Sequence, residues 1–542
     1  MRQGGLRPLI LVRGFGGPDV GDVQASGYQG FNNGTVYPGR RGENYIYEGF
    51  VLRAMKAKRY PYRDATNVVG YYTDEYADVP PDTDGFDTSF LTGAVAVDPS
   101  TAARVLEDGV ASTLWVYRYY DLRPRTIQCF GAGLARLIDI ISACTARQGE
   151  AFDGVDILAH SMGGLVVNAA LKNMAEAGLD VRRVVHRIVT LGTPHRGVPF
   201  DLLPRRLTDI VPGVRDAADE IASFDPSSTA FLDVATWFDP RRILTVVGTD
   251  HRSYGTRIAV AANRMTSLFG DGSLKSNRSD GLIKHTAAQL PGSPRTFVHK
   301  CHGGQDSLVT SREAYEIAMR FFHGTHRVCL WLDDAEVSHG GHHFGRSEFY
   351  LGVSIKPLYV DFELFHQSLE AENCYGPFHD PRLNDPLPDR DVALRRPLLE
   401  SSGQINMWAG PDRLIWEGWL DANLAATRDP VFRIDIYVGE RDTFGTGFSD
   451  NVVFRKQYYV QAILGDGPVS LYVHSGERYL GPKEPASGAE LERIAETSAT
   501  ALVQRAQPNG RPGEWTFGTR GTAFAATWRV AICPEDNRAN LG

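Results

Sequence analysis

The chain has 542 residues, of which 42% are hydrophobic and 23% charged, and its formal net charge is −8. This composition is that of an ordinary soluble globular protein, and the length predicts two domains. The acidic balance, with no basic stripe, excludes nucleic-acid binding through the phosphate backbone as the main function.

The first predicted element is an apolar strand at residues 8–12, which runs into the turn Arg13-Gly14-Phe15-Gly16-Gly17. Glycines let a backbone approach a substrate closely, so such a turn can carry an N–H donor for an oxyanion. We assign this role to Phe15. An ordinary strand-ending turn is the alternative, whereas the glycine spacing does not fit a dinucleotide-binding motif.

Residues 18–112 are less regular, with helix candidates at 47–57 and 99–108. Apolar residues at near-helical spacing then predict a helix within residues 124–147 that lies against the sheet.

The strongest chemical signal lies at residues 155–165, where an apolar strand is followed at once by Ser161 and a glycine-rich helix start. Strand, sharp turn and helix are the context of a nucleophile elbow, in which the turn lifts a serine hydroxyl above the sheet. Small residues at Ala159 and Gly163 allow the strand and the helix to approach. We predict Ser161 as the nucleophile and the Met162 N–H as an oxyanion donor; a small-residue turn without chemistry is the alternative.

Two aspartates compete for the acid that orients a catalytic base. A predicted strand at 243–248 is followed by Asp250 and, after a long excursion, by Asp280. His195 follows the strand at 187–191, which is too early in the chain for the base of such a sheet, and we interpret it as a structural or pocket-rim residue.

The base is expected between the last strand of the domain, predicted at 295–298, and a helix at 311–322. Both His299 and His302 lie in this connection. His302 lies deeper in the loop, beside glycines that permit a tight excursion, and is favoured over His299.

Over about residues 7–324 the chain resembles bacterial lipases and esterases of the α/β-hydrolase superfamily. The matching segments are residues 12–17, 159–164, 191–197 and 279–283. The resemblance implies Asp280 over Asp250 as the acid, because in such lipases the acid is an aspartate followed by Gly-Leu-Val, and here Gly-Leu-Ile follows. The chain departs from the pattern at Arg13, where a histidine is usual, and at Ala159, where a glycine is usual.

The resemblance implies a serine hydrolase that cleaves carboxylic esters, of a lipid-like acyl type, through an acyl-enzyme. Its catalytic residues would be Ser161, Asp280 and His302, without a cofactor, and its partner would be a small-molecule ester or lipid. Three alternatives stay open: an acyltransferase with the same triad, amide or peptide hydrolysis, and a non-catalytic binding protein on a hydrolase scaffold. Residues 120–123 are similar to a segment of phospholipid:sterol acyltransferase relatives, which points toward the first.

We expect two domains. Residues 1–325 would form an α/β-hydrolase domain, with a mostly parallel sheet, helices on both faces and a helical cap at about 198–240. The apolar residues of that cap could recognise acyl chains or pack as a small core of their own. Aromatic and β-branched runs, such as residues 359–365, predict an antiparallel β-sandwich over 326–542, with one helix at 488–506.

The second domain carries no clear chemistry, and a structural or dimerising role is its default interpretation. A carbohydrate- or lipid-surface-binding module is the next alternative, followed by a calcium-dependent sandwich. The acidic residues at 380–391 and the histidines at 339–343 are interpreted as loops and not as metal sites. The six cysteines lack metal-ligand spacing. Neither a membrane span nor a signal peptide is expected, which favours a cytoplasmic protein with at most transient contact with lipid surfaces; a trimmed leader or another export route is the alternative.

Overall fold

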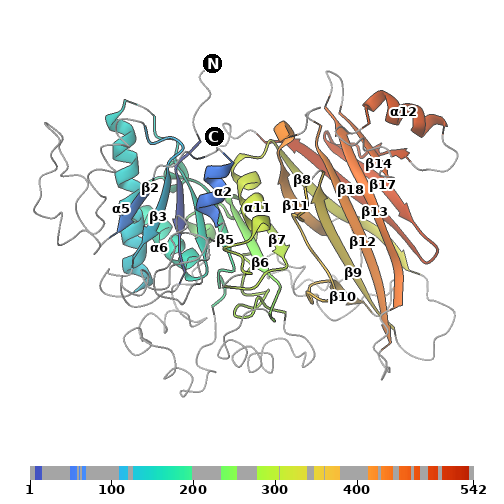
Figure 1. Cartoon of the computed structure of the whole chain (residues 1–542), viewed down its shortest axis with the longest axis horizontal. Coiled ribbons are helices and arrows are strands. Elements are labelled where there is room, and N and C mark those ends of the chain that lie inside the picture. The colour runs from blue at the N-terminus through green and yellow to red at the C-terminus, as the bar shows by residue number, and fades with distance from the viewer. Residues whose placement is uncertain are drawn as a thin grey trace, which may run out of the picture. The chain divides into compact units, whose positions relative to one another are not determined.

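The structure is a computed structural model that describes residues 6–14, 49–57, 60, 64–68, 109–119, 126–149, 151–197, 234–252, 278–303, 306–337, 347–358, 360–378, 413–424, 429–442, 451–464, 469–475, 486–497 and 503–535. The chain divides into two compact units (Figure 1). The first consists mainly of Met1–Ser293 and Lys300–Tyr315, and the second mainly of Pro294–His299 and Glu316–Asn540. The predicted boundary at residue 325 stays a proposal.

The first unit is built on parallel strands in the order β2-β3-β1-β4-β5-β6. Their bounds are β1 (Leu9–Val12), β2 (Asp64–Val68), β3 (Leu114–Arg118), β4 (Val155–His160), β5 (Val185–Leu191) and β6 (Ile243–Gly248). Strand β7 (Arg295–Val298) falls within the residues of the second unit. Every residue of β1, β4, β5 and β6 is buried, because both faces of a parallel sheet are covered.

The register of the sheet determines where the loops after its strands lie. Val12 of β1 is opposite Ala159 of β4, and His160 of β4 is opposite Leu191 of β5. Leu191 in turn pairs with Val246 of β6. The carboxyl ends of these four strands therefore meet at one edge, where ligands bind in open α/β sheets.

The helices of the first unit are α2 (Phe50–Lys56), α5 (Ile127–Arg147), α6 (Met162–Glu176) and α7 (Val181–Val184), together with the start of α11 (Arg312–His323). Helices α5 and α6 lie side by side (Figure 1). A Cβ on Gly131 of α5 would lie 2.6 Å from the Cβ of Ala169 in α6, so the missing side chain permits this contact.

Helix α5 is the only helix among the described ranges with the length and apolar composition of a membrane span, which the sequence analysis did not anticipate. Its apolar residues Phe130, Leu134 and Ile141 are nevertheless fully buried in the core of the first unit. The apolarity of α5 is therefore accounted for by packing inside the protein.

The second unit contains two antiparallel sheets, in the orders β10-β9-β12-β13-β14-β15 and β11-β8-β18-β17-β16. Their bounds are β8 (His326–Val337), β9 (Ser347–Pro357), β10 (Tyr375–Phe378), β11 (Leu414–Leu420), β12 (Val431–Asp442), β13 (Asn451–Ile463), β14 (Ser470–His474), β15 (Val503–Arg505), β16 (Gln507–Pro508), β17 (Glu514–Arg520) and β18 (Phe524–Pro534). In β17, Trp515, Phe517 and Thr519 alternate inward, as expected of a sheet with one solvated face. The predicted fold class, an α/β-hydrolase fold followed by an antiparallel sandwich, is confirmed.

Two predicted elements of the second unit differ from the structure. Helix α12 (Gly488–Thr497) ends earlier than the predicted 488–506, and residues 503–505 form strand β15. Residues 360–365 form a loop and not the predicted strand. The side chains of Phe362, Leu364 and Phe365 in this loop are buried.

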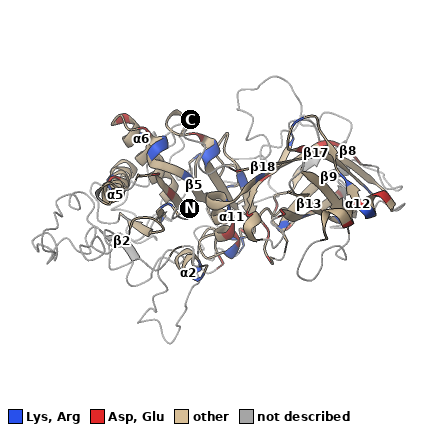
Figure 2. Cartoon of the chain, turned by 90° about the horizontal axis from the view of Figure 1, so that it is seen from above, with Lys and Arg blue, Asp and Glu red and all other residues tan. Residues whose placement is uncertain are grey.

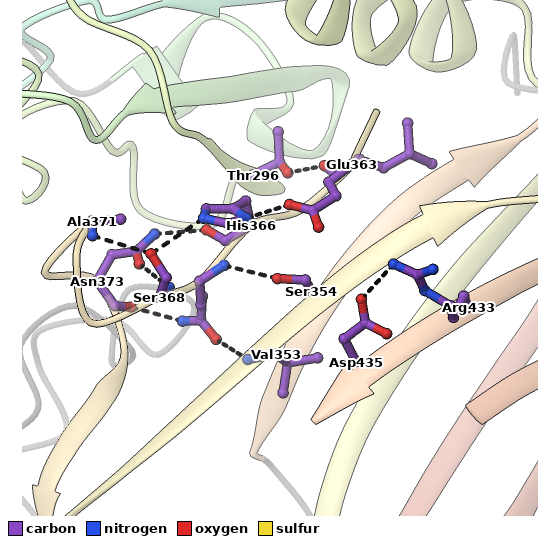
Figure 3. Close-up of polar contacts among 12 residues, drawn as sticks. Thr296, Val353, Ser354, Glu363, His366, Ser368, Ala371, Asn373, Arg433 and Asp435 are labelled. Atoms are coloured by element: carbon purple, nitrogen blue, oxygen red, sulfur yellow. Dashed lines mark hydrogen bonds and ion pairs between the residues drawn. The ribbon is translucent and has the colours of Figure 1, made fainter. Parts of the chain in front are cut away.

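The loop 360–373 is tied to β7 and β9 by polar contacts (Figure 3). The Thr296 hydroxyl donates to the carbonyl of Leu364, and the N–H of His366 donates to the carbonyl of Phe297 at 3.1 Å. The side-chain amide of Gln367 accepts from the N–H of Val353 at 3.1 Å and donates to the carbonyl of Asn373. The loop also pairs with β9 through its backbone, since the Ile355 N–H donates to the Phe365 carbonyl at 2.8 Å and the Leu364 N–H donates to the Ile355 carbonyl at 2.7 Å.

Basic and acidic residues are interspersed along the described elements of both units (Figure 2).

Candidate active site

Ser161 occupies the sharp turn between β4 and α6. Its backbone has φ 54° and ψ −128°, a left-handed conformation that residues with a Cβ rarely adopt. The turn is held on both sides: the Ser161 N–H donates to the Leu191 carbonyl at 2.9 Å, and the Gly164 N–H donates to the Ser161 carbonyl at 3.1 Å. The strand, turn and helix predicted from the sequence are therefore present, with the strain of a nucleophile elbow.

The glycines after Ser161 let the elbow helix touch backbone. A Cβ on Gly163 would lie 2.5 Å from the Arg13 carbonyl oxygen and 2.6 Å from that of Val12. A Cβ on Gly164 would lie 2.3 Å from the Thr193 hydroxyl. All three distances are shorter than any side chain tolerates, so α6 can begin here only because these two positions lack side chains.

The structure brings Ser161, His302 and Asp280 into one hydrogen-bonded line. His302 Nε2 lies 2.9 Å from Ser161 Oγ, and His302 Nδ1 lies 2.8 Å from Asp280 Oδ2. A carboxylate can only accept, so Nδ1 carries the proton and Nε2 presents its lone pair to the serine hydroxyl. Relative exposures of 8%, 3% and 1% for Ser161, His302 and Asp280 keep the line out of bulk water.

The second oxygen of Asp280 is also fixed. Oδ1 accepts the N–H of Ile283 at 2.7 Å and that of Leu282 at 3.0 Å, while the His302 N–H donates to the Asp280 carbonyl at 2.8 Å. The carboxylate therefore has one orientation, with its charge stabilised by backbone donors.

Two glycines at the strand ends make room for Asp280 and His302. Gly192, just after β5, has φ +54°, and a Cβ there would lie 2.8 Å from Asp280 Oδ2 and 3.1 Å from His302 Nδ1. A Cβ on Gly248, at the end of β6, would lie 2.7 Å from the Asp280 Cβ. Asp280 and His302 thus pack on bare backbone at the carboxyl edge of the sheet.

His160, to which the sequence analysis gave no role, contacts His302. Its Nε2 lies 2.8 Å from the His302 carbonyl oxygen, and the two rings are 4.9 Å apart. Burial, followed by the charges of His302 and Arg13, holds the pKa of His160 well below 6.5. His160 is therefore a neutral donor to the His302 carbonyl; its place beside the predicted nucleophile was the only signal in the sequence.

The alternative residues occupy other positions. Asp250 Oδ1 accepts the N–H of Arg252 at 2.9 Å, and the His299 ring lies 5.8 Å from that of His366. His195 Nε2 lies 3.0 Å from the Thr190 hydroxyl, and burial, followed by the Arg196 charge, lowers the pKa of His195 to about 3. The structure therefore brings Asp280 and His302 to Ser161, and not these three.

Of the two predicted oxyanion donors, Met162 is described and Phe15 lies outside the described residues. Met162 is the first residue of α6 and is fully buried. Its N–H belongs to the first turn, at the positive end of the helix dipole, where the amides lack the i−4 acceptors that the rest of the helix has.

Other predictions also fall outside the described ranges: the segment 120–123, most of the predicted cap (198–233), residues 339–343 and residues 380–391. Among the residues that the structure describes, no group of three or more His, Cys, Asp or Glu residues could hold a metal ion.

Residues 128–215 match a protein family described as a PGAP1-like alpha/beta domain, which spans α5, β4, the elbow, α6 and β5. No curated protein sequence matches the chain. Among solved structures, the chain is similar to lipase BlEst2 of Bacillus licheniformis in its propeptide form, with 11% identity and a TM-score of 0.30 over 85% of this chain and 94% of that one. It is also similar to phospholipase PlaB of Legionella pneumophila, with 10% identity and a TM-score of 0.33 over 84% of this chain and 94% of that one. The resemblance to the α/β-hydrolase superfamily is confirmed at the level of the fold.

Proposed function

We propose that the chain is a serine hydrolase that cleaves carboxylic esters, of a lipid-like acyl type, through an acyl-enzyme on Ser161. The observation that supports it most is the line from Ser161 Oγ through His302 to Asp280, which starts at a strained serine on a helix N-terminus. Neither a metal nor an organic cofactor enters the reaction as we propose it.

In the first half-reaction Ser161 Oγ attacks the ester carbonyl carbon while His302 Nε2 takes the hydroxyl proton. The tetrahedral intermediate collapses when the C–O bond to the alcohol breaks, and the His302 imidazolium returns the proton to the leaving oxygen. In the second half, a water molecule attacks the acyl-enzyme as His302 takes its proton. Ser161 then leaves as the alcohol, protonated by the same imidazolium.

Asp280 holds the proton on His302 Nδ1 and stabilises the imidazolium that forms in both halves. A charged His160 ring, 4.9 Å from His302, would oppose that cation. Since burial lowers the pKa of His160, this neighbour stays neutral and the imidazolium forms without repulsion.

We propose the N–H groups of Met162 and Phe15 as donors to the tetrahedral oxygen. The assignment of the Met162 N–H is supported by the position of Met162 as the first residue of α6, where backbone N–H groups can bind an anion. Loss of one such donor typically lowers kcat by about 10² to 10³.

A fluorophosphonate probe tests the nucleophile, and a series of p-nitrophenyl esters from acetate to palmitate tests the reaction. We expect one covalent adduct per chain on the peptide that contains Ser161, and turnover of the esters. An unmodified Ser161 in folded protein would leave only a hydrolase scaffold.

The leaving group and the acceptor are tested separately. Matched p-nitroanilides are expected to react far more slowly than esters, and faster anilide cleavage would favour an amidase. An added long-chain alcohol is expected to leave free acid as the main product; a dominant new ester would favour the acyltransferase.

A further inference from the structure

The hydrogen bond between Ser161 and His302 joins the end of a strand to a loop. His160 is the last residue of β4 and pairs with Leu191 of β5, and Ser161 follows it directly. His302 lies in the loop that follows β7. Loops hold side chains less firmly than strands do, so the position of the His302 ring depends on contacts that fix its backbone.

His160 connects this strand end to the backbone of His302. Its Nε2 lies 2.8 Å from the His302 carbonyl oxygen, and because a carbonyl only accepts, His160 Nε2 carries the proton and donates. The N–H of His302 donates to the Asp280 carbonyl at 2.8 Å. The peptide groups on both sides of His302 are therefore fixed, one from the loop of Asp280 and one from β4.

The imidazole rings of His160 and His302 also pack against each other, with centroids 4.9 Å apart and 40° between their planes. Both residues are buried. Burial, followed by the charges of His302 and Arg13, holds the pKa of His160 well below 6.5, so this ring stays neutral while the His302 cation forms. Two consecutive residues thus hold His302: Ser161 Oγ lies 2.9 Å from its ring Nε2, and His160 bonds its carbonyl.

We propose that His160 is a positioning residue for catalysis, whose Nε2–H holds the His302 backbone so that the His302 ring stays within reach of Ser161 Oγ. The proposal rests on the proposed function, which makes His302 the base. His160 acts through His302, and it neither contacts the substrate nor transfers a proton.

Two variants separate the hydrogen bond of His160 from the packing of its ring. Gln and Met side chains are similar in length and volume, but only Gln has an N–H donor near its end. Met suits an apolar interior better, because a buried amide with incomplete partners costs free energy. A positioning role therefore gives His160→Gln the higher kcat, whereas a packing role gives it to His160→Met.

We expect His160→Met to lower kcat for a p-nitrophenyl ester by about 10- to 10²-fold with little change in KM, because a misplacement of about 1 Å at the reacting groups can cost about 10² in rate. His160→Gln should retain most of the wild-type kcat. The rate of labelling by fluorophosphonate should follow the same order, since that reaction also requires His302 to take the Ser161 proton.

His186→Met is the matched control for the loss of a buried imidazole. His186 is the second residue of β5, near the amino ends of the strands, and its Nδ1 lies 2.8 Å from Asp156 Oδ1. The variant should lower the melting temperature, because Asp156 loses this hydrogen bond, and should leave kcat near the wild-type value. A loss of kcat as large as that in His160→Met would overturn the positioning role.

A second background tests whether His160 acts through His302. His302→Ala removes the ring that His160 would position and leaves a residual rate. In that background His160→Met should cause no further loss, because residues that act as a unit are not additive. A further loss as large as in the wild-type background would show that His160 acts elsewhere and would overturn the proposal.

Equal kcat values for His160→Gln and His160→Met, or a higher value for His160→Met, would also overturn the positioning role and leave the proposed hydrolysis intact. A wild-type protein that neither cleaves esters nor reacts with fluorophosphonate would instead overturn the proposed function itself.

Discussion

Two regions of the molecule each hold a serine, a histidine and a carboxylate in a hydrogen-bonded line. In the first unit the line joins Ser161 to His302, 141 residues later, and then to Asp280. In the second unit His366 Nδ1 bonds Glu363 and His366 Nε2 lies 3.2 Å from Ser368 Oγ, all within one loop (Figure 3).

The two lines differ in the state of the serine. Ser161 has a positive φ and precedes a helix of 15 residues, whereas Ser368 has no such strain. Ser368 Oγ instead accepts the N–H of Ala371 at 3.1 Å, so it closes its own turn. The Ser368 hydroxyl therefore stabilises the turn of its own loop through this hydrogen bond.

The histidine and the carboxylate are more deeply buried in the first line than in the second. The side chains of His302 and Asp280 are 4% and 1% exposed, against 26% and 30% for His366 and Glu363. Electrostatic contacts weaken in contact with water, so the second line stabilises a developing cation less. The two lines are thus distinguished by the strained serine and the buried carboxylate of the first line, and not by their pairs of hydrogen bonds.

The largest expected effect separates the two serines directly. Ser161→Ala should lower kcat for a p-nitrophenyl ester by about 10⁶-fold, because the nucleophile is lost. Ser368→Ala should keep wild-type kcat and wild-type fluorophosphonate labelling. Retained activity in Ser161→Ala, with loss in Ser368→Ala, would reverse the assignment of the two regions.

The two acids provide the next comparison. Asp280→Asn should lower kcat by about 10⁴-fold, because an amide no longer holds the His302 tautomer or stabilises its cation. Glu363→Gln, the matched change in the second line, should leave kcat within twofold. Comparable steady-state losses in both variants would show that the loop 360–373 contributes to turnover.

A smaller effect is expected at the strand end beneath the first line. Gly192→Ala places a Cβ 2.8 Å from Asp280 Oδ2, and the resulting shift should lower kcat by about 10²-fold. Gly178→Ala is the control, since Gly178 also has a positive φ, +80°, but nothing lies within 4 Å of its Cβ position. Both variants bear backbone strain of about 1–2 kcal/mol, visible as a lower melting temperature, and only Gly192→Ala should lose activity.

The smallest effect concerns acid stability of the first unit. The pKa of His195, about 3, is lowered mainly by burial, so between pH 6.5 and 3 the unfolded chain binds a proton that the folded chain does not. The free energy of unfolding should therefore decrease as the pH falls below 6.5, with His195 contributing about 1–2 kcal/mol of the loss at pH 5. Urea titrations at pH 7.5 and 5 should show a smaller decrease for His195→Asn, and an unchanged decrease would contradict this reasoning.

Local patterns were sufficient for the elbow. Residues 155–165 contain the strand, the serine and the helix start together, and the structure has β4 at Val155–His160 and α6 from Met162. Local patterns were insufficient at residues 359–365, where an apolar run predicted a strand. There the structure has one isolated bridge, between Ile355 and Phe365, and no continuous strand over the described residues 360–365.

The acid shows what residues alone left open. Asp250 and Asp280 both follow β6 in the chain, and no periodicity separates them; only the resemblance to lipases implied Asp280. In the folded protein the bare backbone of Gly192 and Gly248 leaves space for Asp280 beside His302. That space results from strands that are distant in sequence.

By itself, the sequence determined the strained turn at Ser161, because strand propensity, small residues and a helix start act over a few neighbouring positions. It also determined the change from parallel α/β patterning to antiparallel β patterning. Only the tertiary structure decided which carboxylate and which histidine reach that serine. Those contacts depend on the order β3-β1-β4-β5-β6, which brings the ends of separate strands to one edge of the sheet.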